Sequence, residues 1–376
     1  MRYGGVEKAL LDILRSINYE RYEVDLLLFE GKGEYYNSIP LSVNIIFKDL
    51  NNTYGGFASS IIRSLKEKDF LSLYARIIFL ICSVLNNNVL LKLLKTPLIG
   101  KNDYDFAIAF RTGFCTDVVQ YIVNAKKKST WWHHGEMNLS EKKLKQFEEA
   151  CNKIKNIVAV STSTEKMLLK NIPSIKNYLK VIPNMIDVSN INRMALEFNP
   201  NFNNKKKHFI TACRIAPEKH IENVIFATDL LLKRGFTNFH WHVIGDGEDL
   251  VKMEMLSRNT KTENHVIFEG KMKNPYPFIK NADLYIHTSY IESQGLSILE
   301  SMALNIPCVI TDNEGIRDYT NNYNSVVVKQ NAGALANAVF ELSKDQEKYN
   351  FLKMHTKCPD QFSKLNVMEK FYQLVN

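Results

Sequence analysis

Short segments rich in β-branched and aromatic residues alternate with amphipathic helical segments along the whole chain, and this alternation constrains the fold most. The strands expected in the first half are 22–29, 43–47, 106–110, 130–133, 156–161 and 178–182. Those expected in the second half are 208–213, 240–244, 266–269, 284–288, 308–311 and 325–328. Strands separated by helices are typical of parallel sheets, so we predict an α/β fold.

A connector separates the two series of strands. It contains Pro183 and Asn184 and continues into an Asn- and Lys-rich stretch at 199–207. Such residues are typical of loops, and a chain of 376 residues is long enough for two domains. The predicted parts are an amino-terminal domain at 1–187, a second domain at 188–358, and a C-terminal helix within 359–376 that packs back on the first domain. Two doubly wound domains facing across a cleft would bind ligands at the carboxyl ends of their strands.

Composition excludes several other classes of protein. Apolar residues make up 45% and charged residues 23% of the chain, which is unlike a disordered or collagen-like sequence. The six cysteines are scattered without a CxxC pair and without neighbouring histidines. This pattern argues against a disulfide framework and a zinc site, and it favours a reducing compartment. The longest apolar stretch, 77–91, is interrupted by Ser83 and three asparagines, whereas a spanning helix needs about 20 apolar residues. We therefore expect a cytoplasmic protein.

The positive charge is confined to the first half. Residues 1–180 carry 26 basic and 18 acidic side chains, whereas residues 181–376 carry 22 of each. This asymmetry suggests that the two halves meet different partners. The charge is diffuse and no nucleic-acid-binding motif focuses it, so a nucleic acid is not expected among them.

The segment 285–300 joins the end of a strand to a helix and carries two carboxylates. Glu292 lies in the turn, the helix opens near Gly295, and Glu300 follows on the helix. A helix N-terminus offers unpaired N–H groups and a partial positive charge, which suit a phosphate or sugar hydroxyls. The alternative is an exposed loop glutamate and a solvated helix glutamate without a joint function.

The segment 211–220 follows the first strand of the second half. Its Arg214 and Lys219 lie five positions apart on one loop. An arginine fork and a lysine point charge can converge on one diphosphate, and no metal is then needed to neutralise it. The alternative is a surface arginine and a surface lysine that act separately.

Together, in this order and spacing, the two segments resemble the family-4 retaining glycosyltransferases of the GT-B fold. Glu292 and Glu300 match that family's Glu-x7-Glu motif, and Arg214 and Lys219 match its Arg-x4-Lys clamp. The remaining matches are Gly4-Gly5-Val6-Glu7, Trp132-His133-His134-Gly135-Glu136, and Pro183-Asn184 with Asp187. The resemblance covers nearly the whole chain and implies a nucleotide diphosphate sugar as donor.

The resemblance also implies roles for these residues. Arg214 and Lys219 would hold the donor diphosphate, and the backbone of Gly4 and Gly5 would approach it closely. Glu300 would bind the ribose. The implied catalytic and sugar-binding groups are Glu292, His134 from the other domain, and the backbone N–H groups of Gly295, Leu296 and Ser297. His133 is interpreted as an outward-pointing neighbour, and no metal or cofactor is expected.

The sequence departs from the family in several places. Cys213 and His220 stand where the family commonly has glycine, and Ser293-Gln294 replaces a Gly-aromatic pair. Only three residues precede the Gly-Gly loop, whereas the family places an apolar strand there. We therefore expect that the first strand is missing from this sequence and that a version extended upstream would be more stable.

The predicted activity is transfer of a hexosyl or N-acetylhexosaminyl unit to a glycan or lipid-linked glycan acceptor in surface polysaccharide biosynthesis, for lipopolysaccharide or capsule. The resemblance implies that the amino-terminal domain binds the acceptor, and basic residues within 60–128 flank the apolar stretch. This pattern favours peripheral binding to an anionic membrane, unless 77–85 faces the core. The alternatives are a non-catalytic scaffold or partner subunit of the same fold, and a nucleotide-sugar 2-epimerase.

Overall fold

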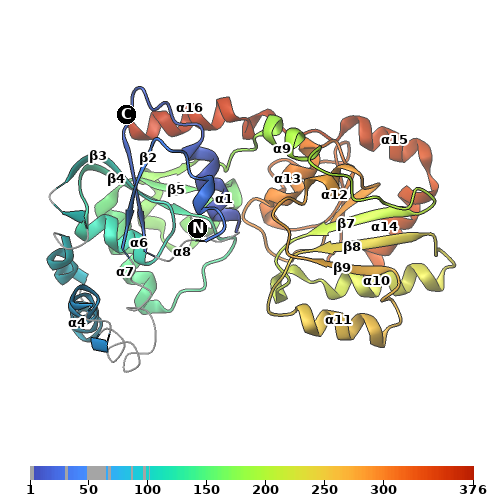
Figure 1. Cartoon of the computed structure of the whole chain (residues 1–376), viewed down its shortest axis with the longest axis horizontal. Coiled ribbons are helices and arrows are strands. Elements are labelled where there is room, and N and C mark those ends of the chain that lie inside the picture. Colours follow the sequence, from blue (N-terminus) through green and yellow to red (C-terminus); the bar gives the residue numbers. More distant parts are fainter. Residues whose placement is uncertain are drawn as a thin grey trace. The chain divides into compact units, whose positions relative to one another are not determined.

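The chain folds into two α/β units, seen in a computed structural model (Figure 1). The structure describes residues 4–29, 33–48, 65–66, 69–85, 88–95, 99–100 and 102–376. The first unit spans 1–183 together with 367–376, and the second spans 184–366. Strands in both units pair in parallel, as the alternation in the sequence predicts.

The second unit contains one six-stranded parallel sheet. Its strands are β7 (Lys207–Ala212), β8 (Phe239–Ile244), β9 (Val266–Gly270), β10 (Leu284–His287), β11 (Cys308–Thr311) and β12 (Val326–Val328). Their order in the sheet is β12-β11-β10-β7-β8-β9. The chain therefore runs outward from β7 in one direction and from β10 in the other. The loops after these two adjacent strands meet at the point where the order reverses.

Helices cover both faces of this sheet, because its strands alternate apolar side chains between two cores. Phe209 packs with α10 (Glu222–Lys233), α11 (Leu250–Asn259) and α14 (Ala332–Lys344). The next residue, Ile210, packs into the core formed with α9 (Val188–Met194), α12 (Tyr276–Lys280) and α13 (Leu296–Ala303). Both side chains are fully buried. A strand buried on both faces is typical of a doubly wound sheet.

The first unit has two separate parallel sheets among its described residues. One pairs β1 (Val24–Leu28) with β2 (Val43–Phe47), and the other has the order β3-β4-β5-β6. The latter strands are Asp103–Ala109, Asn124–Trp132, Ile157–Ala159 and Leu179–Val181. The Tyr104 hydroxyl of β3 donates a hydrogen bond of 2.8 Å to the Asp25 carboxylate of β1. This contact joins side chains, so β1 and β3 lie near each other without a shared ladder.

The helices of the first unit include α1 (Gly5–Leu14), α4 (Phe70–Leu85), α7 (Glu141–Ile154) and α8 (Thr162–Asn171). The helix α4 packs its buried Ala75, Ile78 and Cys82 against Leu91 and Leu94 of the segment that follows it. None of the helices in the described part of the chain is both long enough and apolar enough to cross a membrane.

The last helix, α16 (Lys364–Val375), contacts residues at the other end of the chain. The Tyr372 ring stacks on Tyr22 with 5.5 Å between ring centroids, and its hydroxyl accepts a hydrogen bond of 2.9 Å from the Asn18 backbone N–H. Phe371 is 5% exposed and lies against the fully buried Trp131 of β4, 6.5 Å away by ring centroids. The helix therefore completes the core of the first unit.

Phe371→Ala is expected to lower the unfolding free energy of the first unit by about 3 kcal/mol, because it leaves a cavity beside Trp131. Leu365→Ala on the same helix, where the side chain is 79% exposed, should change it by less than about 0.5 kcal/mol. Urea unfolding followed by tryptophan fluorescence measures both variants. Equal effects of the two substitutions would contradict this packing.

Candidate functional site

The loops that follow β7 and β10 are bonded to each other at the carboxyl end of the second unit's sheet. The Thr288 hydroxyl donates to the Lys219 carbonyl at 2.6 Å, and the Tyr290 N–H donates to the Glu218 carbonyl at 2.9 Å. A short 3₁₀ helix, Pro217–Lys219, and a left-handed His220 complete the first loop before α10 begins. The two motifs found in the sequence are thus brought together.

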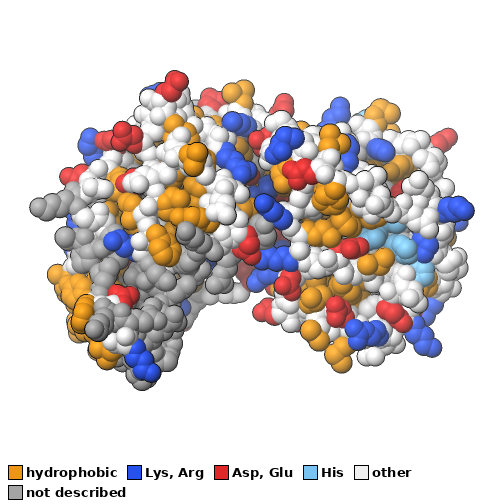
Figure 2. All heavy atoms as spheres, viewed as in Figure 1, with side chains coloured by type: hydrophobic (Ala, Val, Ile, Leu, Met, Phe, Trp, Pro, Cys, Tyr) orange, Lys and Arg blue, Asp and Glu red, His pale blue; other side chains and the backbone are white. Residues whose placement is uncertain are grey.

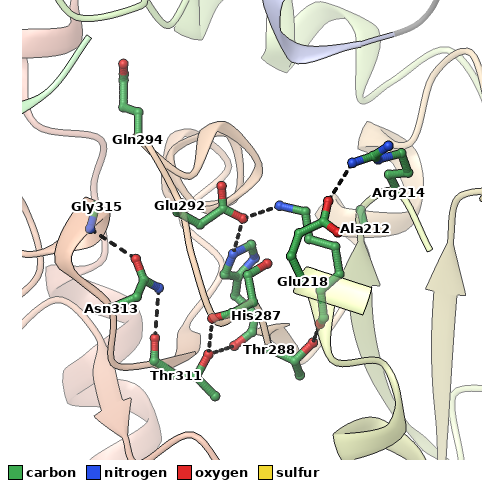
Figure 3. Close-up of polar contacts among 12 residues, drawn as sticks. Ala212, Arg214, Glu218, His287, Thr288, Glu292, Gln294, Thr311, Asn313 and Gly315 are labelled. Atoms are coloured by element: carbon green, nitrogen blue, oxygen red, sulfur yellow. Dashed lines mark hydrogen bonds and ion pairs between the residues drawn. The ribbon is translucent and has the colours of Figure 1, made fainter. Parts of the chain in front are cut away.

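Glu292 lies where the two loops contact each other (Figure 3). Its Oε1 atom lies 2.5 Å from Lys219 Nζ and 2.9 Å from His287 Nε2. The side chains of Lys219 and Glu292 are 18% and 12% exposed, and His287 is 2% exposed. Both contacts use the same carboxylate oxygen, so Oε2 is left to accept hydrogen bonds from a ligand. His287 was missed by sequence reasoning, although it occupies the last position of β10.

The pair of Lys219 and Glu292 is ionised. Burial alone would raise the pKa of Glu292, but the Lys219 ammonium and the His287 hydrogen bond outweigh it and hold the pKa well below its usual range. Burial would likewise lower the pKa of Lys219, and the Glu292 carboxylate outweighs it and raises that pKa. Glu292 is therefore a hydrogen-bond acceptor at neutral pH.

Arg214 stands on the same loop with its own carboxylate partner. Its Nη2 atom lies 2.5 Å from Glu218 Oε1, and the arginine side chain is 66% exposed. Arg214 and Lys219 thus do not share a partner in this structure, and each positive charge is balanced by a neighbouring glutamate. An anion that used both cations would compete with Glu218 for the arginine.

The helix α13 begins beside Glu292 at a glycine that its surroundings require. Gly295 has φ +66°, and a Cβ atom there would lie 2.8 Å from the Tyr319 hydroxyl and 2.9 Å from Ile298 Cδ1. Leu296 and Ser297 form the first turn, whose N–H groups have no partner within a helix. Glu300 lies on the same helix and is 7% exposed. The alternative of an exposed loop glutamate and a solvated helix glutamate is therefore wrong.

Gln294, a departure from the family pattern, binds the motif that contains Asn184. Its Oε1 accepts a hydrogen bond from the Asn184 N–H, and its Nε2 donates one to the Asn184 carbonyl, both at 2.8 Å. Gln294 is 1% exposed. Asp187, three residues along, caps α9 by accepting from the Asn190 N–H at 2.9 Å. The Pro-Asn-x-x-Asp segment therefore holds the loop before α13 in place.

Two further glycines allow backbones to approach the site closely. A Cβ atom at Gly247 would lie 2.1 Å from the carbonyl oxygen of Ile215, next to Arg214. A Cβ atom at Gly315 would lie 2.2 Å from the carbonyl oxygen of Glu292. The turn at 245–248 thus packs under the Arg214 loop.

The residues expected from the first unit form their own group. Gly4 and Gly5 lie at the start of α1. On the same helix, Glu7 Oε1 lies 3.7 Å from Nη1 of Arg111, a residue that follows β3. Partial burial, with the nearby Arg111 charge, lowers the pKa of His134, and Glu136 opposes this shift. The His134 side chain reaches the surface, and its lowered pKa favours the neutral ring at pH 7. Arg111 was not singled out in the sequence.

His133 does not point outward, and that interpretation is wrong. It is 8% exposed and packs against Phe110 and Trp131, with ring centroids 4.7 and 5.9 Å away. The last four residues of β4 are buried, and His133, which follows them, also points into the protein.

Known proteins are similar to this chain in sequence. Residues 192–357 match a family described as "Glycosyl transferases group 1". The poly(glycerol-phosphate) alpha-glucosyltransferase of Bacillus subtilis is 27% identical over 237 residues, which are 61% of this chain and 34% of that protein. The poly(ribitol-phosphate) alpha-N-acetylglucosaminyltransferase of Staphylococcus aureus is 24% identical over 254 residues, which are 63% of this chain and 47% of that protein. The chain thus spans less than half the length of these relatives.

A solved structure shows the same fold over nearly the whole chain. Anabaena Alr3699/HepE in complex with UDP and glucose has a TM-score of 0.70 at 16% identity, covering 99% of this chain and 97% of that one. Staphylococcus aureus TarM has a TM-score of 0.57 at 22% identity, covering 68% and 51%. The fold is therefore GT-B, as the motifs indicate.

Lys219→Met is expected to lower the unfolding free energy of the second unit by about 2–3 kcal/mol at pH 7. The reason is that Glu292 then keeps a largely buried charge with His287 as its remaining partner. Arg214→Met on the same loop should cost less than about 1 kcal/mol, because that arginine is exposed. Chemical denaturation of both variants measures the difference.

The pH dependence of this difference provides a check. The pKa of Glu292 is depressed in the folded protein, so its pairing stabilises the protein above the unfolded value of about 4.3 and ceases to do so as pH falls through the folded value. The difference in unfolding free energy between wild type and Lys219→Met should therefore become smaller in acid. A difference that stays constant from pH 7 to the acid limit would contradict the ionised pair.

Proposed function

We propose that this chain, whose residues 192–357 match the group 1 glycosyl transferases, moves a hexosyl or N-acetylhexosaminyl unit from a nucleotide diphosphate sugar to a glycan or lipid-linked glycan acceptor. We further propose retention of the anomeric configuration and a role in surface polysaccharide biosynthesis. The observation that supports this most is the cluster of Lys219, Glu292 and His287, at the carboxyl ends of β7 and β10 within the matched segment.

Arg214 and Lys219 would bind the donor diphosphate. As the glycosidic bond breaks, negative charge develops on the leaving diphosphate, and cations placed in advance stabilise that charge more than they stabilise the ground state. Arg214 would leave Glu218 to do so, since its side chain is exposed and free to turn. The N–H groups at the start of α13, in Gly295, Leu296 and Ser297, would add partial positive charge.

Glu292 would orient the transferred sugar. Its Oε1 atom is held by Lys219 and His287, which leaves Oε2 directed at a hydroxyl of the donor sugar. A carboxylate that stays ionised is suited to accept such a bond and to stabilise positive charge near the anomeric carbon. Glu300 would bind the ribose. In this proposal His134 contacts the donor sugar, Gly4 and Gly5 approach the diphosphate, and no metal takes part in the transfer.

The names of the relatives support the acceptor class. Two are transferases of polyol-phosphate polymers, and one is a lipopolysaccharide 1,6-galactosyltransferase of Salmonella typhimurium, 34% identical over 85 residues. The solved neighbour of this fold from Anabaena binds UDP. UDP is therefore the first nucleotide to test.

Wild-type protein is expected to bind UDP in a calorimetric titration, and Arg214→Ala should weaken binding about tenfold or more through the loss of a charge-assisted hydrogen bond of about 1.5–3 kcal/mol. Arg258→Ala is the matched control, because Arg258 is also exposed and also paired with a glutamate four positions away. Release of nucleotide from a panel of nucleotide sugars should be lost in Glu292→Ala. If UDP, GDP and ADP all fail to bind, the enzyme proposal is wrong and a scaffold is favoured.

The helix α4 supports a second part of the proposal, which is peripheral binding to an anionic membrane at the cytoplasmic face. One side of α4 packs inward, whereas its other side exposes apolar residues at helical spacing. The exposed residues are Phe70, Tyr74, Ile77, Leu80, Ile81, Val84 and Leu85, with exposed fractions from 37% to 75%. Figure 2 shows hydrophobic side chains gathered where Figure 1 labels α4. The core-facing alternative for 77–85 thus holds for Ile78 and Cys82 but not for Ile77, Leu80, Ile81, Val84 and Leu85.

Among the described residues, fewer lysines border this surface than the range 60–128 suggests. Lys92 and Lys95 lie beside α4, on or next to the segment Asn88–Leu94 that packs on it. The run at 126–128 belongs to β4 and is already bonded: Lys126 to Asp105, Lys127 to the Asn376 carbonyl, and Lys128 to the Gln120 carbonyl. The membrane-binding surface would therefore consist of α4 with Lys92 and Lys95.

The full chain is expected to cosediment with phosphatidylglycerol vesicles and only weakly with phosphatidylcholine vesicles. Val84→Asp should weaken this binding about tenfold, since a buried valine contributes about 1.5 kcal/mol. Val251→Asp in the second unit is the control, because Val251 is also an exposed helical valine, 67% against 75% for Val84. Equal binding of both variants, or no binding by wild type at any salt concentration, would overturn this surface.

A further inference from the structure

Three histidines converge toward the amino ends of two strands in the second unit's sheet, whereas the candidate site lies at the carboxyl ends. His208 lies near the start of β7, and His240 and His242 lie on β8, with His208 directly across from His240 in the register. Side chains two positions apart on a strand share a face. One ring nitrogen from each histidine lies within 4.8 Å of those of the other two. Figure 2 shows the histidine patch over the beginnings of these strands.

Hydrogen bonds determine which nitrogen of two rings carries the proton. His208 Nε2 lies 3.1 Å from the carbonyl oxygen of Asn203, and His242 Nδ1 lies 2.7 Å from Glu269 Oε1. Both partners are acceptors, so both of these nitrogens must donate. The remaining nitrogens, His208 Nδ1 and His242 Nε2, then carry lone pairs when the rings are neutral.

These two lone pairs face each other. His208 Nδ1 and His242 Nε2 are 2.9 Å apart, and both histidines are 4% exposed. Phe202 stacks on both rings, with centroids 4.2 and 4.7 Å away, which restrains them from turning apart. Two buried nitrogens at this distance repel each other unless a proton or a metal ion lies between them.

His240 adds a third nitrogen to the same place. The Lys206 ammonium lies 2.7 Å from His240 Nε2 and can only donate to it, so that nitrogen also presents a lone pair. Neutral imidazole nitrogens are ligands of zinc and related transition metals.

We propose that His208, His240 and His242 form a binding site for a divalent transition-metal ion of the zinc class. Zinc–nitrogen bonds of 2.0–2.1 Å in a tetrahedron separate the nitrogens by about 3.3 Å, so the 2.9 Å pair needs to open only slightly. The Asn203 carbonyl and the Glu269 carboxylate already hold the outer nitrogens of two ligands, an arrangement that orients metal-binding histidines. The Lys206 ammonium competes with the metal for His240 and turns away when the metal binds.

The metal would have a structural role. Asn203 and Lys206 belong to the turn that leads from the connector into β7, and His240 and His242 belong to β8. A bound ion would fix the connector to two strands of the sheet. The candidate site for sugar transfer lies at the other ends of these strands, so the metal site stands independently of the proposed activity.

Zinc binding to the full chain, freed of metal with a chelator, tests this site by calorimetry. We expect one ion per chain in wild type. Binding should be lost in the double variant His208→Gln/His242→Gln, and Glu269→Gln should weaken it about 10–100-fold. Lys206→Gln should tighten binding, because the competing ammonium is gone, and His355→Gln on the remote helix α15 (Gln346–His355) should leave it unchanged.

Cobalt as a substitute metal identifies the ligands, and melting temperatures without metal verify that each variant is folded. The cobalt spectrum should show tetrahedral bands without the sulfur-to-metal charge-transfer band of cysteine ligation. The site is disproved if wild type binds no zinc. It is equally disproved if the folded double variant keeps wild-type affinity, or if the charge-transfer band shows that cysteines are the ligands.

Discussion

The ion pair between Lys219 and Glu292 is the contact on which the second unit's functional end depends. It joins the loop after β7 to the loop after β10, two segments that are adjacent only because the order of strands reverses there. The pair is largely buried, so neither residue can be left alone without a large cost. His287 shares the same carboxylate oxygen and fixes its direction. Gly315 lets the backbone approach the carbonyl of Glu292, and Gln294 ties the same loop to Asn184.

Much of this arrangement could be predicted from the sequence. The alternation of strands and helices gave the fold class, because burial on both faces of a parallel sheet leaves short apolar runs. The spacing of Arg214, Lys219, Glu292 and Glu300 identified the loops that meet. The pairing within them could not be predicted, since Arg214 binds Glu218 rather than sharing a partner with Lys219. Contacts of this kind depend on side-chain directions that spacing does not determine.

The sequence was least informative where the partner lies far along the chain. The lysines at 126–128 resembled a free basic patch, but they lie in a strand that begins at Asn124, and one of them binds the carbonyl of the last residue. The three histidines are not close in the sequence, since 34 positions separate His208 from His242. The alternation of His240 and His242 was a signal that both share a face, but only the register of β7 with β8 brings His208 beside them.

The strands β1 and β2 form a sheet of their own, separate from β3–β6, and this affects local unfolding of the first unit. Backbone hydrogen bonds make the strands of one sheet exchange their amide hydrogens as a group, and no described ladder crosses between these two sheets. A side-chain bond from Tyr104 to Asp25 and apolar packing connect them instead. Among the described residues, the first unit thus has two blocks of strands, and we expect amide hydrogens of the two-stranded block to exchange at the lower free energy.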